Sequence, residues 1–186
     1  MQKLTKCNLE KDNHVQGKKW LSTNSGYFNS KKVFSAFLDA LKKIENALLE
    51  KVLIADLGAG IGNLGELIKK HLESRGFKVI LYLIDASQKQ LNANKNQDTI
   101  KIIQDLEEFN LPVKFDLIIM RSVLHYFANT KRQLKDLKKI KAHLNKNGFF
   151  INQAHCLSNK TEANIMQKMY CNKKFGKRKF STEKVL

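Results

Sequence analysis

The chain has 186 residues, of which 42% are hydrophobic, 34 are lysine or arginine and 17 are aspartate or glutamate. This length and apolar fraction indicate one folded domain and exclude a disordered chain. No apolar stretch approaches the roughly 18 residues of a membrane span, and the lysine-rich N-terminus has no apolar signal segment. The three cysteines form neither a disulfide framework nor a zinc cluster, so we expect a soluble cytoplasmic protein without a metal site.

The formal net charge of +17 arises in residues 1–34, 131–147 and 160–186, which together hold 22 of the 34 basic and 5 of the 17 acidic side chains. The rest of the chain is neutral. Lysines that neutralise phosphates would bind RNA or another anionic ligand. The same charge can also reflect a compositional bias of the genome, because lysine greatly outnumbers arginine. Charge runs are also commonly just solvated faces of a protein. Both interpretations stay open.

The first predicted element is an amphipathic helix over residues 31–50, where apolar side chains recur at helical spacing. A short apolar run at 52–55 predicts a strand, and Asp56 and a cluster of glycines follow it. Helical spacing resumes at 64–72 and stops at Arg75 and Gly76. The order is therefore strand, tight turn, helix.

Further strands and helices alternate along the rest of the chain. Because parallel strands need crossover connections, this alternation predicts an α/β fold with a doubly wound, mainly parallel sheet and helices on both faces. The predicted strands are 79–84, 100–103, 115–120 and 149–152, and the predicted helices are 87–94 and 134–144, the second ended by Asn147 and Gly148.

The glycine loop predicts a ligand site, because ligands of open α/β sheets bind beyond the carboxyl ends of the strands. Residues 60–65 match the pattern GxGxxG literally, and Asp85 lies about 20 residues further on, as in the dinucleotide fingerprint. Taken alone, this pattern would indicate NAD.

A wider pattern favours another cofactor. Residues 56–62, Asp-Leu-Gly-Ala-Gly-Ile-Gly, resemble the DxGxGxG motif of class I S-adenosylmethionine-dependent methyltransferases, in which an acid precedes the loop. Dehydrogenases lack that acid as a rule. Residues 82–85 resemble the family's second motif, 104–106 the stretch after its third strand, and 115–127 its fourth strand and the following loop. Four motifs in this order make the resemblance specific, and it covers about residues 31–156.

The resemblance implies a Rossmann-like methyltransferase fold and S-adenosylmethionine as the cofactor. By analogy, Asp56 orders the loop and contacts the amino-acid end, Asp85 binds the ribose, and Asp105 with Leu106 lies near the adenine. Each acid also suits a strand end or a turn cap, and Leu106 suits a core position. The residues expected to bind the cofactor are Asp56, Gly58, Ala59, Gly60, Gly62, Asp85, Ala86, Asp105, Leu106 and Arg121.

Few catalytic residues are expected, because the sulfonium already activates the methyl group and a base is needed only for a protonated nucleophile. His125, after the fourth strand, is the candidate general base, with a packing role as the alternative, and His155 is a second candidate. The chain lacks the Pro-Pro-aromatic motif of DNA and protein amino-methylating relatives and the Pro-Cys nucleophile of cytosine C5 enzymes, since its single proline is Pro112. The sequence over residues 121–127 more closely resembles that of methyltransferases of small molecules, lipids and biosynthetic intermediates.

We therefore expect methyl transfer to a small-molecule or anionic acceptor. The alternatives are an RNA-associated methyltransferase, a noncatalytic cofactor-binding module and an NAD-dependent oxidoreductase. Residues 1–30 are expected to form an arm or lid, in which Tyr27 closes over the cofactor or packs, and residues 31–156 to form the cofactor-binding domain. Residues 157–186 are expected to form a basic, incomplete end of that domain, so that the sheet would lack its last one or two strands and a partner chain could cover its edge.

Overall fold

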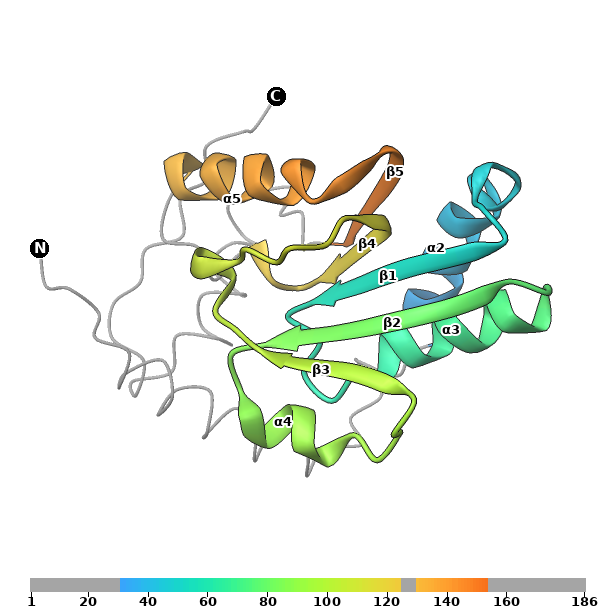
Figure 1. Ribbon diagram of the computed structural model, residues 1–186, viewed down its shortest axis with the longest axis horizontal. Coiled ribbons are helices and arrows are strands. Elements are labelled where there is room, and N and C mark those ends of the chain that lie inside the picture. The colour runs from blue at the N-terminus through green and yellow to red at the C-terminus, as the bar shows by residue number, and fades with distance from the viewer. Residues whose placement is uncertain (1–30, 125–129, 154–186) are drawn as a thin grey trace, which may run out of the picture. The chain divides into compact units, whose positions relative to one another are not determined.

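The computed structural model describes residues 31–124 and 130–153 (Figure 1). Strands and helices alternate through these ranges, as the sequence predicts. The helices are α2 (Lys31–Lys42), α3 (Asn63–Ser74), α4 (Gln88–Ala93) and α5 (Thr130–Ala142), with short 3-10 helices η1 (Glu45–Ala47) and η2 (Leu106–Glu108). The strands are β1 (Lys51–Leu57), β2 (Lys78–Asp85), β3 (Thr99–Ile103), β4 (Phe115–Arg121) and β5 (Leu144–Gln153).

The five strands form one sheet in the order β3-β2-β1-β4-β5, and every neighbouring pair is parallel. The predicted doubly wound α/β fold is confirmed. The direction of winding reverses between β1 and β4, and ligand sites of such sheets lie at the carboxyl ends of the strands beside that point. There Asp56 of β1 aligns with Leu83 of β2 and Ile119 of β4.

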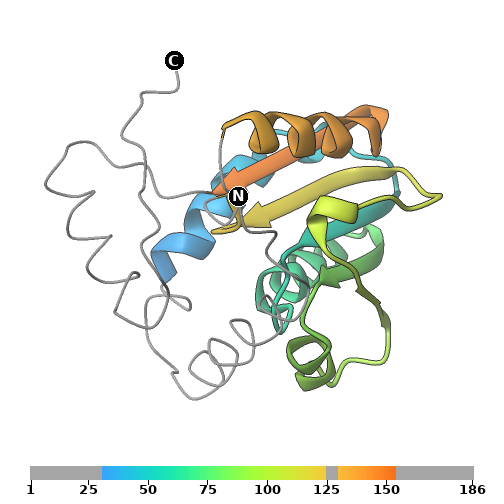
Figure 2. The ribbon, with the colours of Figure 1, turned by 90° about the vertical axis from the view of Figure 1, so that its left-hand side faces the viewer.

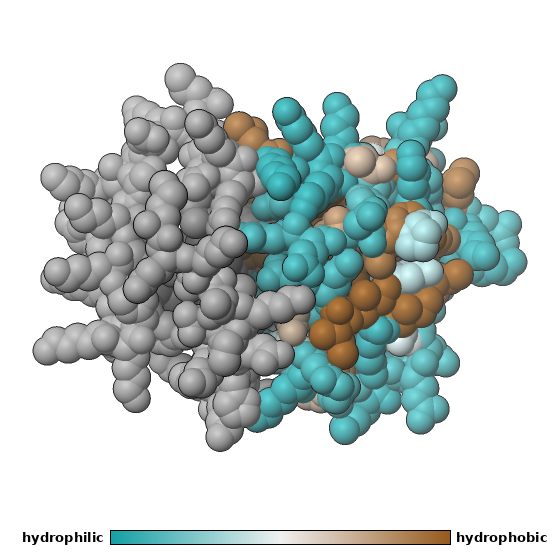
Figure 3. All heavy atoms as spheres, turned by 60° about the vertical axis from the view of Figure 1, so that its left-hand side comes forward, coloured by the Kyte–Doolittle hydropathy of each residue, from teal (hydrophilic) through white to brown (hydrophobic). Residues whose placement is uncertain are grey.

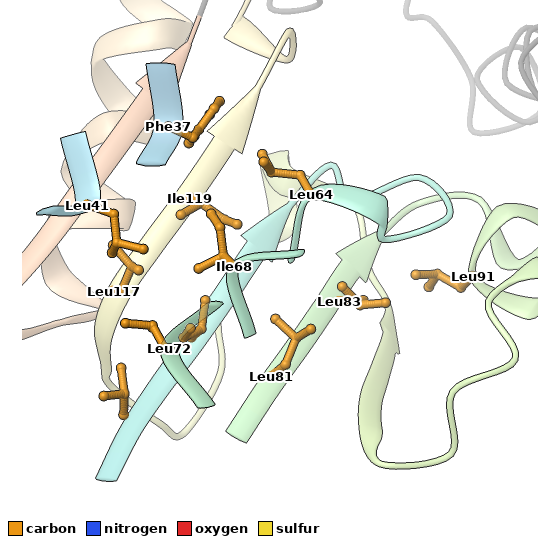
Figure 4. Packing of buried hydrophobic residues seen from close by; sticks show 12 residues of the cluster. Phe37, Leu41, Leu64, Ile68, Leu72, Leu81, Leu83, Leu91, Leu117 and Ile119 are labelled. Atoms are coloured by element: carbon orange, nitrogen blue, oxygen red, sulfur yellow. The ribbon is translucent and has the colours of Figure 1, made fainter. Parts of the chain in front are cut away.

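Successive side chains of a strand point to opposite faces of the sheet. Because the strands carry apolar side chains on both faces, helices cover both of them. On β4, Leu117 and Ile119 pack with α2 and α3, whereas Ile118 and Met120 belong to the cluster that includes Ile140 of α5. Figure 2 shows α3 and α5 on opposite sides of the strands. Figure 4 shows the first cluster, in which Leu64, Ile68 and Leu72 of α3 face Leu81 and Leu83 of β2.

The predicted helix over residues 31–50 is wrong in its extent. The α-helix ends at Lys42, and the chain continues through the 3-10 turn η1 before β1 begins. In this turn Glu45 is buried, and its side chain accepts a hydrogen bond from Nε of Arg75 at 3.2 Å. The apolar spacing continues beyond the helix because Ile44 and Leu48 still pack against the core.

The predicted stop of the last helix at Asn147 and Gly148 is also wrong. Helix α5 ends at Ala142, and β5 begins two residues later. Leu144 pairs with Phe115 and Phe149 with Leu117, so residues 145–148 form an irregular bulge. A Cβ atom on Gly148 would lie 2.8 Å from the carbonyl oxygen of Phe115, so this glycine permits close strand approach rather than ending a helix.

The described surface is largely polar. On the face drawn in Figure 3, hydrophilic side chains surround a narrow strip of hydrophobic ones. None of the helices in the described ranges combines the length and the apolar composition needed to span a membrane. Among the described residues, the exposed large hydrophobic ones are Leu49, Leu67, Ile100, Ile103 and Leu134.

Candidate functional site

The loop between β1 and α3 requires glycine at three positions. Gly58, Gly60 and Gly62 have φ angles of 66°, 59° and 82°, in the left-handed region that favours glycine. Close contacts add a second requirement. A Cβ atom on Gly62 would lie 2.3 Å from Cδ1 of Leu83, and one on Gly58 would lie 2.4 Å from Cγ2 of Val123. The glycines therefore let the loop lie directly on its neighbours.

Backbone hydrogen bonds attach this glycine loop to the end of β2. The N–H groups of Gly58 and Ala59 both donate to the carbonyl oxygen of Ile84, at 2.8 and 3.2 Å. The N–H of Gly60 donates to Oδ2 of Asp85 at 2.8 Å. Strand β2, which ends in Asp85, thus holds the glycine loop in one conformation.

Asp85 uses both carboxylate oxygens. While Oδ2 accepts the Gly60 N–H, Oδ1 accepts the N–H of Ser87 at 2.8 Å, and Ser87 is the N-cap of α4. Burial raises the pKa of Asp85, as does the nearby charge of Asp105, against the lowering effect of the two backbone bonds. A carboxylate has about four acceptor sites, so two remain for hydroxyl donors of a ligand.

Asp56 lies beneath the glycine loop and is 2% exposed. Its Oδ2 accepts the N–H of Gly65 at 3.0 Å, and a Cβ atom on Gly65 would lie 2.9 Å from the same oxygen. The pKa of Asp56 is raised to about 7, chiefly by burial and also by the charge of Asp85, although Gly65 and Arg121 act in the opposite direction. The contact with Gly65 ties the start of α3 to the end of β1.

Asp105 follows β3 and caps η2, because its Oδ1 accepts the N–H of Glu107 at 2.9 Å. This hydrogen bond is the one expected if Asp105 caps a turn, the alternative to its role near the adenine. Its neighbour Gln104 donates its N–H to the carbonyl of Asp85 at 3.1 Å, which places this segment beside the second acid. The side-chain oxygen of Gln104 is buried, and no described group forms a hydrogen bond with it. A ligand amino group could satisfy this acceptor.

For three other residues expected to bind the cofactor, the contacts do not distinguish a binding role from a structural one. Leu106 is partly buried and packs against the cluster that includes Phe109, as the core interpretation predicts. Arg121 ends β4, is half-buried, and lies close enough to Asp56 for its charge to lower that residue's pKa. Ala86 separates Asp85 from the N-cap of α4 and is also half-buried.

The candidate bases cannot be placed, because His125 and His155 lie outside the described residues, as does Tyr27. Their roles stay predictions. The same holds for the arm over residues 1–30 and the segment 157–186.

The structure also shows contacts of the glycine loop that the motifs do not predict, although Ser122 and Val123 lie within the motif over residues 115–127. Val123 packs against Gly58, and Ser122 before it has a φ angle of 53°, the one positive value of a non-glycine residue in the described ranges. Gln90 and Asn94 approach the glycine loop from α4. No sequence pattern indicates these contacts, since they depend on how the loops of different strands meet.

The site thus gathers the predicted acids at one edge of the sheet. Asp85 contacts the glycine loop and the segment beside Asp105, and Asp56 interacts electrostatically with Asp85 and Arg121. Backbone N–H groups, carboxylates and one guanidinium surround the ends of β1 and β2. Such a set suits a ligand with hydroxyl donors and a cationic amino group.

Residues 55–150 match the family described as a methyltransferase domain. The match covers just over half of the chain, so this protein belongs to that family. No curated protein matches the chain significantly.

Solved structures support the same fold. An S-adenosylmethionine-dependent methyltransferase from Clostridium acetobutylicum is 26% identical, with a TM-score of 0.58, over 73% of this chain and 56% of that one. An amino pentose methyltransferase from Micromonospora echinaspora is 14% identical, with a TM-score of 0.59, over 80% and 57%. The N-methyltransferase NodS from Bradyrhizobium japonicum is 13% identical, with a TM-score of 0.59, over 74% and 70%. The chain thus matches little more than half the length of the first two proteins.

Proposed function

We propose that this protein transfers the methyl group of S-adenosylmethionine to a small-molecule acceptor. The observation that carries the proposal is the Asp85 carboxylate at the carboxyl end of β2, which holds the Gly60 N–H at 2.8 Å and retains free acceptor sites. Membership of the methyltransferase domain family supports the reaction.

The site residues fit the parts of this cofactor. Asp85 would accept the ribose hydroxyls, and the buried side-chain oxygen of Gln104 would accept the adenine amino group. Asp56 and the glycine loop would hold the amino-acid end, where a carboxylate attracts an ammonium group. When bound, S-adenosylmethionine supplies a methyl group that its sulfonium already activates. The protein's own task is to align the acceptor and exclude water.

Asp56 also argues against the NAD alternative. Its carboxylate is buried directly before the glycine loop and bonds the Gly65 N–H, so the third glycine of the GxGxxG pattern packs on an acid. Dehydrogenases lack an acid at that place as a rule, whereas the methyltransferase resemblance includes it. The literal dinucleotide fingerprint is therefore better explained as part of a longer methyltransferase motif.

The end of β4 and the residues directly after it support a small acceptor. Residues 120–124 read Met-Arg-Ser-Val-Leu and contain no proline, unlike the amino-methylating enzymes of DNA and protein. Two of the similar structures are described as an amino pentose methyltransferase and an N-methyltransferase. His125, in the continuation of this segment, stays the proposed general base for acceptors that arrive protonated.

The test is transfer of a labelled methyl group. Purified protein is incubated with methyl-labelled S-adenosylmethionine and, separately, with the small-molecule, RNA and protein fractions of a cell extract. We expect label in the small-molecule fraction, strongly reduced in an Asp85→Ala variant. Label in RNA alone would favour the RNA-associated alternative, and NAD binding without S-adenosylmethionine binding in calorimetry would contradict the proposal.

A further inference from the structure

Helix α4 contacts the glycine loop through two side chains one turn apart. The Oε1 atom of Gln90 lies 2.8 Å from the position that a Cβ atom of Gly60 would take. The Nδ2 atom of Asn94, the C-cap of α4, lies 3.0 Å from the corresponding position at Gly62. The loop therefore packs against α4 on one side and against β2 on the other.

Asn94 also forms a hydrogen bond with the loop itself. Its Nδ2 donates to the carbonyl oxygen of Ile61 at 3.1 Å. The peptide that contains this carbonyl also contains the N–H of Gly62, which donates to the carbonyl of Ala59 at 2.9 Å. Both polar groups of that peptide are thus held, so its plane cannot turn without losing a hydrogen bond.

Glu66 fixes the orientation of the Asn94 amide. Its Oε1 accepts Nδ2 of Asn94 at 3.2 Å and the hydroxyl of Thr99 at 2.8 Å, and its Oε2 accepts Nδ2 of Asn96 at 2.8 Å. These bonds outweigh burial and lower the pKa of Glu66, so the carboxylate stays ionised and purely an acceptor. Because Ile61 and Glu66 both present acceptors, the nitrogen of the Asn94 amide must face them.

We propose that Asn94 is a positioning residue, which holds the Ile61–Gly62 peptide in the orientation that receives the cofactor. The inference rests on the proposed function for its effect on S-adenosylmethionine, although the positioning itself is independent of the cofactor. The hydrogen bonds of the Asn94 side chain join it to Ile61, Glu66 and Asn96, and among the described residues none of them reaches Asp85, the residue expected to bind the ribose.

The experiment compares Asn94→Ala with Asn96→Ala. Asn96 offers a matched control, because it lies on the same loop and donates to the same carboxylate, whereas none of its described hydrogen bonds reaches the glycine loop. Asn94→Asp is the second variant, since it keeps the side-chain size and an acceptor for the Asn96 N–H but removes the donor. Calorimetry with S-adenosylhomocysteine and amide hydrogen exchange of residues 58–62 without ligand are the two readouts, after thermal melting shows that the variants fold.

We expect Asn94→Ala to raise the Kd about three- to tenfold, the cost of one hydrogen bond, and to speed exchange at Gly60 and Gly62. Asn94→Asp should change both at least as much, because its carboxylate also lies beside the ionised carboxylate of Glu66. Asn96→Ala should match the wild type in both readouts. An Asn94 variant that binds and exchanges like Asn96→Ala would overturn the inference. A wild type that binds no S-adenosylhomocysteine would instead contradict the proposed function, and the exchange rates would still decide whether Asn94 holds the loop.

Discussion

The carboxylate of Asp85 and the backbone N–H of Gly60 lie 2.8 Å apart, and this contact joins the second predicted acid to the glycine loop. The two residues are 25 positions apart in the sequence. The same carboxylate holds the N-cap of α4 through Ser87. One side chain therefore shapes the loop, anchors a helix and keeps acceptor sites for the proposed ribose.

Replacing Asp85 by alanine should weaken binding of S-adenosylhomocysteine about 10- to 100-fold, because hydrogen bonds to a charged group are lost. Isothermal titration calorimetry measures the change. Asp39→Ala is the control, since Asp39 is an exposed acid of α2. Equal affinities in the wild type and Asp85→Ala would remove Asp85 from the site.

The features that could be predicted from the sequence are those set by local patterns. The continuous apolar run of β2 indicates a strand buried on both faces, and the glycines after β1 indicate a turn with positive φ angles. The order of motifs places Asp56 and Asp85 at strand ends, where the structure has them.

What could not be predicted depends on contacts between distant segments. Asn94 bonds the carbonyl of Ile61 from 33 residues away, and nothing in its local sequence distinguishes it from Asn92 or Asn96. The bulge in β5 likewise includes a contact between distant residues, since Nδ2 of Asn145 donates to Oδ1 of Asp116 at 2.6 Å. Helical spacing alone predicted neither this bulge nor the early end of α2.

Asp56→Asn should stabilise the protein at neutral and alkaline pH. The pKa of Asp56 in the folded state, about 7, lies above the ordinary aspartate value of 3.8, so the folded state holds the proton more tightly than the unfolded state. The free energy of unfolding of the wild type therefore falls as the pH rises from about 4 to 7. Above pH 7 the total loss reaches roughly 4 kcal/mol. The asparagine carries no charge and can still accept the Gly65 N–H.

Urea denaturation between pH 4 and pH 8 tests this prediction. The variant should resemble the wild type at pH 4, where Asp56 is protonated in the folded state, and should exceed its free energy of unfolding increasingly up to pH 7. It should also bind S-adenosylhomocysteine more weakly at pH 8, because the proposed partner of the ammonium group has lost its charge. A pH-independent difference in stability would show that burial of the Asp56 charge is not its source.

Gly62→Ala should destabilise the fold more than Gly76→Ala. The two glycines have φ angles of 82° and 93°, so alanine meets similar backbone strain, about 1–2 kcal/mol, at both. A Cβ atom at Gly62 also lies 2.3 Å from Leu83, whereas nothing lies within 4 Å at Gly76. Overpacking adds about 1–3 kcal/mol at Gly62 alone. Urea denaturation of both variants measures the difference, and equal losses would mean that Leu83 yields without cost.

His143→Phe should reduce the free energy of unfolding by about 1–3 kcal/mol, although phenylalanine preserves the ring packed 4.4 Å from Phe109. His143 is buried, and its Nε2 accepts the N–H of Leu111 at 3.1 Å while Nδ1 lies 2.8 Å from the carbonyl of Lys139. The neutral tautomer with its proton on Nδ1 satisfies both contacts. Phenylalanine leaves the Leu111 N–H without its partner, whereas the Lys139 carbonyl still accepts the backbone N–H of residue 143 at 3.1 Å.

His71→Phe is the matched control for that substitution. Its ring is also partly buried, with 23% of the side chain exposed, but its Nε2 has no hydrogen-bond partner among the described residues and lies 3.8 Å from Glu45, which Arg75 also contacts. The control should therefore change stability by less than about 0.5 kcal/mol. Chemical denaturation at pH 8 compares the two variants. If both histidines were equally tolerant of phenylalanine, the packing of His143 against Phe109, rather than its two polar contacts, would account for its place in the fold.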